Sequence, residues 1–306
     1  MGGDFFNLEC MTRLALIATG GTIACTTVAD GSLAPTVSGA DLAADIDAEV
    51  VEFRQLDSSS ITLADLDELI AVVNSQTARE DIGGVIITHG TDSMEETALA
   101  LEIFCGGTKP IVLTGAQRSY DHPEADGPSN LRDARDLAAN GEPGVFLCFG
   151  GETIPARGAR KRHTSDLRGF ESMQVPGTTP HLAPAPLAPH PVEIIPAYPG
   201  AGRLLVDAAV NSPAAGLVIE AMGSGNMGEE MGRALADALH AGLPVILSTR
   251  TPYGSTALSY GGDGGGASLR KLGAISAGYF RPGQARILLA AALATGTDPA
   301  ELFVQE

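Results

Sequence analysis

The stretch Val85–Thr97, VIITHGTDSMEET, joins a short apolar run to a polar turn and the start of a helix. A β-branched apolar run bounded by turn residues is typical of a strand buried on both faces of a parallel sheet. Asp92 or Ser93 suits the cap of the following helix, and Glu95 and Glu96 lie in its first turn. This turn is therefore predicted at the carboxyl end of a strand, where open α/β sheets bind their ligands. Taken alone, the stretch is equally well explained as a capped turn whose polar residues only satisfy backbone groups.

A second stretch has the same organisation. The apolar run Leu14–Ala18 leads into Thr19-Gly20-Gly21-Thr22, where two glycines allow a sharp turn and a close approach of substrate. Two strands of one sheet thus deliver threonines to the same edge. Because a hydroxyl is a weak nucleophile until a base takes its proton, Asp92 and a lysine from elsewhere would complete a catalytic group.

Lys161 is the candidate for that lysine, since no other lysine lies between Lys109 and Lys271. It occurs in a polar, basic stretch, and an isolated lysine in a chain that otherwise uses arginine is also compatible with an incidental position. A lysine that must lose its proton cannot, however, be replaced by arginine. A free lysine has a pKa of about 10.4, so such a base needs burial or suitable neighbours.

Strands and helices are predicted in steady alternation. This pattern indicates βαβ units with helices on both faces of a parallel sheet. We expect an α/β fold: a large amino-terminal doubly wound domain with a mostly parallel sheet, and a smaller carboxyl-terminal α/β domain with a parallel sheet. The predicted strands are 14–18, 49–53, 85–88, 110–113, 144–149, 217–221 and 244–248, and the main predicted helices are 62–73, 93–104, 129–140, 228–240 and 282–294.

The length and the distribution of proline predict the domain organisation. A chain of 306 residues suggests two domains at about 150 residues each. Residues 175–199 are rich in proline, which fixes φ and removes backbone donors, so the boundary is placed there. The predicted units are 1–187 for the large catalytic domain, 188–202 for a linker and 203–306 for the small domain. Residues 1–10 are expected to be a non-native extension, with Met11 as the natural start. The polar segment 25–36, directly behind Thr22, is expected to be a loop, either a lid over the site or a disordered connection.

Composition excludes several classes of function. A formal net charge of −18 and a pI of about 4.6 argue against nucleic acid and anionic membranes as partners. The four cysteines are widely spaced with no CxxC pair, which favours reduced thiols and no zinc site. No zincin, α/β-hydrolase or P-loop motif occurs. The amino terminus lacks the basic and apolar regions of a signal peptide, so a cytoplasmic protein is expected.

The segment Gly223–Gly228 fits the pattern GxGxxG between a predicted strand and a predicted helix, as in dinucleotide-binding proteins. It opens the smaller domain, however, and the next strand ends in Ser-Thr-Arg250 without an acid to hold a ribose. A tight turn that projects Asn226 is the preferred interpretation, although Arg250 leaves a phosphorylated ribose open.

Several motifs together resemble the bacterial-type L-asparaginase family, from Leu14 to the carboxyl terminus. The specific ones are ATGGTIA at 18–24, THGTDSMEETA at 88–98 and LTGAQR at 113–118. Weaker ones are DGPSNLRDA at 126–134, SGN at 224–226 and QARILL at 284–289. The resemblance implies hydrolysis of an amide side chain through a threonine acyl-enzyme, without cofactor or metal. It also implies dimers or tetramers with active sites shared between subunits.

The resemblance carries roles onto individual residues. Thr22 matches the nucleophile, and Thr91, Asp92 and Lys161 match the triad in which neutral lysine is the base. Ser58 and Asp92 match positions that bind the α-carboxylate and α-amino groups of the substrate, and Asn226 matches one that reaches the site from a neighbouring subunit. The full set of implied substrate-binding residues is Gly21, Ser58, Ser59, Gly90, Asp92, Ala116 and Asn226.

Two departures from the family pattern bear on affinity and substrate preference. The predicted lid contains no tyrosine. In addition, no glutamate lies between Glu230 and Glu301 to bind the substrate's amino group, and Asp263 is the nearest carboxylate that could replace it. The expected activity is conversion of L-asparagine and water to L-aspartate and ammonia. The alternatives are a glutaminase-asparaginase of broader specificity, the ammonia-producing subunit of a tRNA-dependent amidotransferase, and an amino-acid-binding regulator without turnover.

Overall fold

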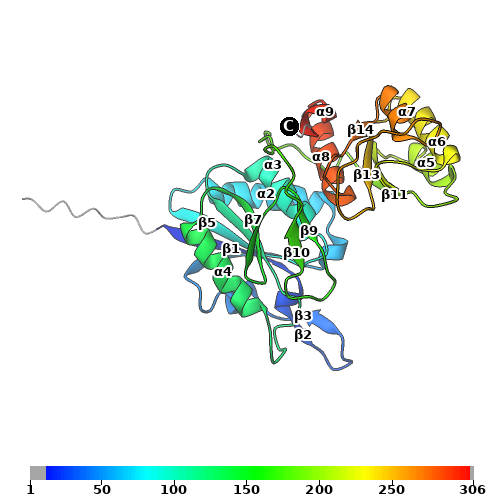
Figure 1. Cartoon of the computed structure of the whole chain (residues 1–306). Helices are drawn as coiled ribbons and strands as arrows, with labels where there is room; N and C mark the ends of the chain where they lie inside the picture. Colours follow the sequence, from blue (N-terminus) through cyan, green and yellow to red (C-terminus); the bar gives the residue numbers. More distant parts are fainter. Residues whose placement is uncertain (1–11, 304–306) are drawn as a thin grey trace, which may run out of the picture.

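The computed structural model describes residues 12–303, so the predicted extension at residues 1–10 lies outside the described residues. A large α/β domain carries a smaller α/β domain on one side (Figure 1). The large domain is built on a six-stranded sheet of order β4-β1-β5-β6-β7-β8, parallel except for the last pair. Among the helices of residues 12–303, none combines the length and the apolar character needed to cross a membrane.

Helices cover both faces of this sheet, which confirms the predicted doubly wound, mostly parallel architecture. Side chains of β1 alternate between two cores: Ala15 and Ile17 pack on the face of α2 and α3, while Leu14 and Leu16 pack on the face of α1 and α4. The strands are β1 (Arg13–Gly20), β4 (Ala48–Leu56), β5 (Ile82–Thr88), β6 (Pro110–Thr114), β7 (Gly144–Phe149) and β8 (Glu152–Pro155). The helices are α1 (Gly39–Leu42), α2 (Leu63–Thr77), α3 (Met94–Cys105) and α4 (Gly127–Asn140).

Local capping chemistry accounts for several helix starts. Thr62 and Asp65 form a capping box at α2, because each side chain accepts a hydrogen bond from the backbone N–H of the other. At α3 the N-cap residue is Ser93, but its side chain makes no capping bond. Its hydroxyl instead donates to the carbonyl of Ser58 at 2.6 Å, so this residue joins the end of β4 to the start of α3.

Two short hairpins interrupt the alternation. The segment predicted as a loop at 25–36 contains an antiparallel hairpin of β2 (Cys25–Thr27) and β3 (Leu33–Pro35), so the prediction of an irregular loop is wrong. Backbone pairing and a turn at Gly31 order it although its residues are small and polar. A second hairpin, β9 (Ala159–Lys161) with β10 (Phe170–Ser172), places Lys161 opposite Phe170.

The small domain has a four-stranded parallel sheet of order β11-β12-β13-β14, as expected. Helices α5 and α6 share one core with it, whereas α8 packs on α3 and joins the main core of the large domain. Its elements are β11 (Val192–Pro196), β12 (Gly216–Ala221), β13 (Val245–Thr249), β14 (Ile275–Ser276), α5 (Leu204–Val210), α6 (Glu229–His240), α7 (Gly266–Lys271), α8 (Pro282–Thr295) and α9 (Pro299–Leu302).

Strand β11 lies inside the segment 188–202 that was predicted as a linker. It is an edge strand whose residues Val192–Pro196 pair with Gly216–Glu220 of β12. Proline is tolerated at this position because an edge strand has one side without ladder partners. The middle of the predicted linker is therefore part of the small domain's sheet, and this part of the prediction is corrected.

Candidate active site

The two threonine-bearing turns lie side by side because their strands are neighbours. Strands β1 and β5 pair in parallel with Ala18 opposite Thr88, so both turns leave the same edge of the sheet. Contact between them is tight: a Cβ on Gly21 would lie 2.4 Å from the backbone nitrogen of Gly90. Gly21 also has φ 84° and ψ 174°, a conformation open almost only to glycine.

Lys161 reaches this edge from the β9–β10 hairpin. Its Nζ donates to Thr91 Oγ1 at 2.7 Å and to Asp92 Oδ1 at 2.8 Å. The lysine side chain is 20% exposed and the aspartate side chain 60% exposed, so the pair lies at the rim of a hollow rather than in the core. A lysine nitrogen and a hydroxyl in direct contact, with a carboxylate alongside, form the arrangement that proton transfer between lysine and threonine requires.

A cavity of about 400 Å³ joins these groups. Most of the sequence-predicted residues line it: Gly21, Thr22, Ser58, Gly90, Thr91, Asp92 and Lys161. The Thr22 side chain is half-buried in the first turn of the 3-10 helix Thr22–Ala24, and its hydroxyl has no hydrogen-bond partner among the described residues. The cavity therefore brings together the complete predicted catalytic set.

Three predicted binding residues lie elsewhere. Ser59 and Ala116 do not line the cavity, and Ala116 is buried behind it, against Gly127. Asn226 lies in the small domain, in a tight turn between β12 and α6, where its backbone N–H donates to the Met222 carbonyl at 2.9 Å. The Asn226 Oδ1 is buried and has no hydrogen-bond partner within residues 12–303.

Ser58 connects the end of β4 to the turn that follows β5. It lies 5% exposed after β4, and its Oγ accepts a hydrogen bond from the backbone N–H of Asp92 at 3.2 Å. A Cβ on Gly90 would lie 2.4 Å from the same Oγ, so a larger residue than glycine does not fit there. The ends of β1, β4 and β5 thus fix one another's positions.

His89 supports the turn from inside. Its ring is fully buried, with Nδ1 donating to the Gly90 carbonyl at 2.7 Å and Nε2 accepting from the Thr97 hydroxyl at 3.1 Å. Burial lowers the pKa of His89 to about 4, against the hydrogen bond to Gly90, which acts in the opposite direction. His89 is therefore a neutral structural residue near pH 7, outside the catalytic group.

Sequence reasoning missed several residues that line the cavity: Cys25, Leu33, Pro35, Leu56, Asp57, Gln117 and Thr164. Asp57 had an available signal, because it comes four residues after the end of a predicted strand, as Thr22 does. Its Oδ1 caps the next turn by accepting from the Ser59 N–H at 3.1 Å, and it forms no ion pair in the described part of the chain. The second carboxylate of the cavity, Asp92, is already paired with Lys161.

Asp263, the residue considered as a replacement for the missing glutamate, does not line this cavity. Its Oδ2 accepts from Arg233 Nη1 at 2.6 Å on the surface of the small domain. The charge of this carboxylate is thus balanced by a neighbour within the same domain.

Comparisons with known proteins find L-asparaginases among the relatives of this chain. A probable L-asparaginase from Deinococcus radiodurans is 34% identical, over 94% of this chain and 95% of that protein. A probable periplasmic L-asparaginase from Haemophilus influenzae is 28% identical, over 98% and 93%. The crystal structure of a probable cytoplasmic L-asparaginase from Campylobacter jejuni has a TM-score of 0.85 at 29% identity, covering 96% of this chain and 100% of that chain.

The family models extend over nearly all of the described chain. Residues 13–181 match the family described as Asparaginase, N-terminal, and residues 191–303 match the Glutaminase/Asparaginase C-terminal domain. The first match includes Thr22, Thr91, Asp92 and Lys161, and the second includes strand β11, which lies inside the predicted linker. The chain therefore belongs to the bacterial-type asparaginase family.

Proposed function

We propose that this protein is an amidohydrolase that converts L-asparagine and water to L-aspartate and ammonia. The observation that carries the proposal is the contact of Lys161 Nζ with Thr91 Oγ1 at 2.7 Å, in the same cavity as the hydroxyl of Thr22. Two alcohols and a lysine are the groups that acyl transfer from an amide needs when no thiol or imidazole takes part. Membership of the asparaginase family supports the amide as substrate.

In the proposed reaction the Oγ of Thr22 attacks the side-chain amide carbon. A new C–O bond forms, the C–N bond breaks, and the leaving nitrogen takes a proton and departs as ammonia. The resulting ester on Thr22 is then cleaved by water, which releases aspartate and restores the hydroxyl. Both steps pass through an oxyanion, which backbone N–H groups at glycine-rich turns can stabilise.

The triad of Thr91, Lys161 and Asp92 handles the protons in this proposal. Neutral lysine accepts the proton of Thr91, and the Thr91 oxygen in turn accepts one from the incoming nucleophile. Asp92 holds Lys161 in place at 2.8 Å and stabilises its charged form when the proton has arrived. This order explains why the lysine contacts Thr91 directly.

The charged groups of the amino acid have counterparts in the cavity. Asp92 and Ser58 are proposed to bind the α-amino and α-carboxylate groups, because the Asp92 N–H contacts the Ser58 hydroxyl and thereby places both at one end. Asp57 supplies an additional carboxylate for the α-ammonium group, since its charge is not compensated by a cation within residues 12–303. This residue is our proposed replacement for the glutamate that the small domain lacks.

The test is ammonia release from L-asparagine and L-glutamine, measured with the purified full chain and with Thr22→Ala, Thr91→Ala and Lys161→Met. We expect each variant to lose at least about 10²-fold in kcat. Thr26→Ala is the matched control, because Thr26 lies on the β2–β3 hairpin and its hydroxyl forms a hydrogen bond with the Thr36 hydroxyl, outside the lining of the cavity. Trapping of an ester on Thr22 would support the proposed order, whereas an ester on Thr91 with Thr22 free would refute it.

We further propose that the chain forms homodimers or homotetramers in the cytoplasm, with Asn226 reaching the active site of a neighbouring subunit. The proposal is supported by the position of Asn226 outside the cavity of its own chain. Light scattering on the purified protein tests the assembly. Mixing inactive Thr22→Ala with inactive Asn226→Ala should restore activity if the site is shared, and a failure to restore it would argue against sharing.

A further inference from the structure

The short segment Thr91–Glu95 contacts both ends of Lys161. At the far end, Thr91 and Asp92 accept hydrogen bonds from Nζ. At the near end, the Glu95 carboxylate accepts a hydrogen bond from the backbone N–H of Lys161. One end of helix α3 therefore fixes where the lysine starts and where its side chain ends.

We propose that Glu95 is a positioning residue for the reaction, holding the backbone of Lys161 so that Nζ meets Thr91 Oγ1. This inference deepens the proposed function and rests on Lys161 as the base. A lysine side chain has several rotatable bonds, so its tip is fixed only when its backbone is fixed as well. Strand β9 has three residues and ends at Lys161, which places the lysine next to the loop that connects the two strands of a short hairpin.

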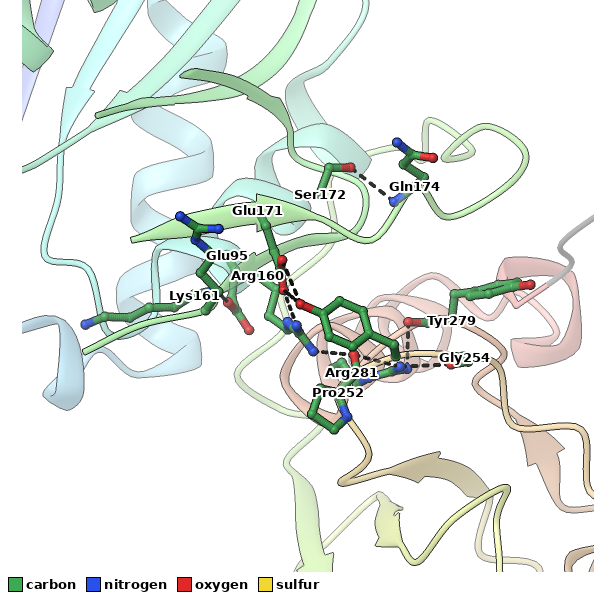
Figure 2. A network of polar contacts seen from close by, with 12 residues as sticks. Glu95, Arg160, Lys161, Glu171, Ser172, Gln174, Pro252, Gly254, Tyr279 and Arg281 are labelled. Atoms are coloured by element: carbon green, nitrogen blue, oxygen red, sulfur yellow. Dashed lines mark hydrogen bonds and ion pairs between the residues drawn. The ribbon is translucent and has the colours of Figure 1, made fainter. Parts of the chain in front are cut away.

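Other contacts of the β9–β10 hairpin attach it to the small domain. Figure 2 shows Arg160, next to Lys161, paired with Glu171 and facing the Tyr253 loop of the small domain. The guanidinium of Arg160 donates to the Pro252 carbonyl, and that of Arg281 donates to the same carbonyl at 3.1 Å. These contacts attach the hairpin to the small domain. Within residues 12–303, the hydrogen bond to Glu95 is the one that attaches the Lys161 backbone to the threonine-bearing segment.

Gln284 of α8 fixes the backbone around Glu95. It is 2% exposed, and its Nε2 donates to the carbonyls of Glu95 at 3.1 Å and of Ala156 at 2.8 Å. Its Oε1 accepts from the Gly158 N–H at 3.0 Å. One side chain therefore connects the start of α3 to the turn that leads into β9, which fixes the position of the Glu95 carboxylate relative to the Lys161 N–H.

The charges around Glu95 determine which variant is informative. Burial and the neighbouring Glu96 carboxylate raise the pKa of Glu95 to about 7, although Arg160 and Lys161 act in the opposite direction. Whether ionised or protonated, the carboxyl keeps an oxygen that accepts from the Lys161 N–H. Glutamine at this position also keeps such an oxygen, whereas alanine removes it.

The experiment compares Glu95→Ala with Glu95→Gln in the full-length enzyme. We expect alanine to lower kcat by about 10²-fold, as a displacement near 1 Å does, with little change in KM, and glutamine to restore most of it. Glu96→Gln is the matched control, because Glu96 is the adjacent carboxyl of the same helix and, within residues 12–303, forms no hydrogen bond or ion pair with Lys161. A melting temperature measured for each variant separates loss of fold from loss of position.

A crystal structure of Glu95→Ala distinguishes this inference from the proposed function. We expect the distance from Lys161 Nζ to Thr91 Oγ1 to lengthen from 2.7 Å in the alanine variant and to be retained in the glutamine variant. An unchanged distance, or a kcat within about twofold of wild type, would overturn the positioning role. If the wild-type enzyme released no ammonia from either amide, the proposed function would fail while the distance still tested the positioning of Lys161.

Discussion

Replacing Gly21 by alanine tests whether the close approach of the two turns is essential. Gly21 has φ 84°, and an added Cβ would lie 2.4 Å from the nitrogen and 2.6 Å from the Cα of Gly90. Ordinary contacts between such atoms are about 3.5–4.0 Å, so the turns must separate by roughly 1 Å. Gly31→Ala is the control, because Gly31 has φ 83° but nothing within 4 Å of its Cβ position.

The two variants share one cost and differ in another. Placing alanine at positive φ costs about 1–3 kcal/mol at either site. Overpacking against the backbone of Gly90 adds about 1–3 kcal/mol at Gly21 only. At about 2–4 °C per kcal/mol, we expect Gly21→Ala to melt several degrees below Gly31→Ala. A separation near 1 Å between Thr22 and Thr91 should also lower kcat/KM by about 10²-fold.

The assay is thermal unfolding together with ammonia release from L-asparagine. Gly31→Ala should be destabilised with kcat/KM close to that of wild type, since its Cβ meets no atom. The reasoning is refuted if both variants melt at the same temperature and Gly21→Ala retains wild-type kcat/KM. That result would mean that the turns move apart at no cost and that their contact does not position the threonines.

Asp57→Asn should lower kcat/KM for L-asparagine about 10–100-fold, as loss of a hydrogen bond to a charged group does. The kcat/KM for succinamic acid, which lacks the α-amino group, should be unaffected. An equal loss for both substrates would contradict the assigned role. Lys161→Arg should lower kcat about 10²–10⁴-fold with KM little changed, because arginine keeps the charge but cannot act as a base. Near-normal turnover in this variant would exclude neutral lysine as the base. His89 has a folded-state pKa of about 4 against an unfolded value of 6.5, so the unfolded chain binds the extra proton between these values. The contribution of His89 to the free energy of unfolding, about 3 kcal/mol, is therefore complete above pH 6.5 and is lost as pH falls toward 4. The difference between wild type and His89→Gln in the free energy of unfolding, measured with denaturant, should disappear over that range.

The sheet and the two threonine turns were predictable because local sequence decides them. Short apolar runs that end in glycine and threonine specify buried strands and their turns, and neighbouring parallel strands must end at one edge. The position of Thr22 beside Thr91 followed from this reasoning. Asp57 follows the same rule, because it comes directly after β4 at this edge.

Other features depend on contacts between segments that are distant in sequence. The order of the hairpin at residues 25–35 comes from backbone pairing that its small polar residues do not signal. The strand β11 forms because β12 offers an edge, although flanking prolines suggested a linker. The hydrogen bond from Lys161 to Glu95 spans 66 residues, and no local pattern predicts it.

The threonines and the lysine are therefore positioned by different means. Pairing of β1 with β5 fixes the two hydroxyls, because a change of register would move an entire buried strand. The lysine arrives from outside the sheet, and its position depends on Glu95 on one side and on the small-domain contacts of Arg160 on the other. A perturbation of the small domain should consequently displace the base while the two alcohols remain in place. Such a perturbation would reduce turnover without unfolding the large domain. We therefore expect the turnover rate to be most sensitive to changes at the contact between the two domains.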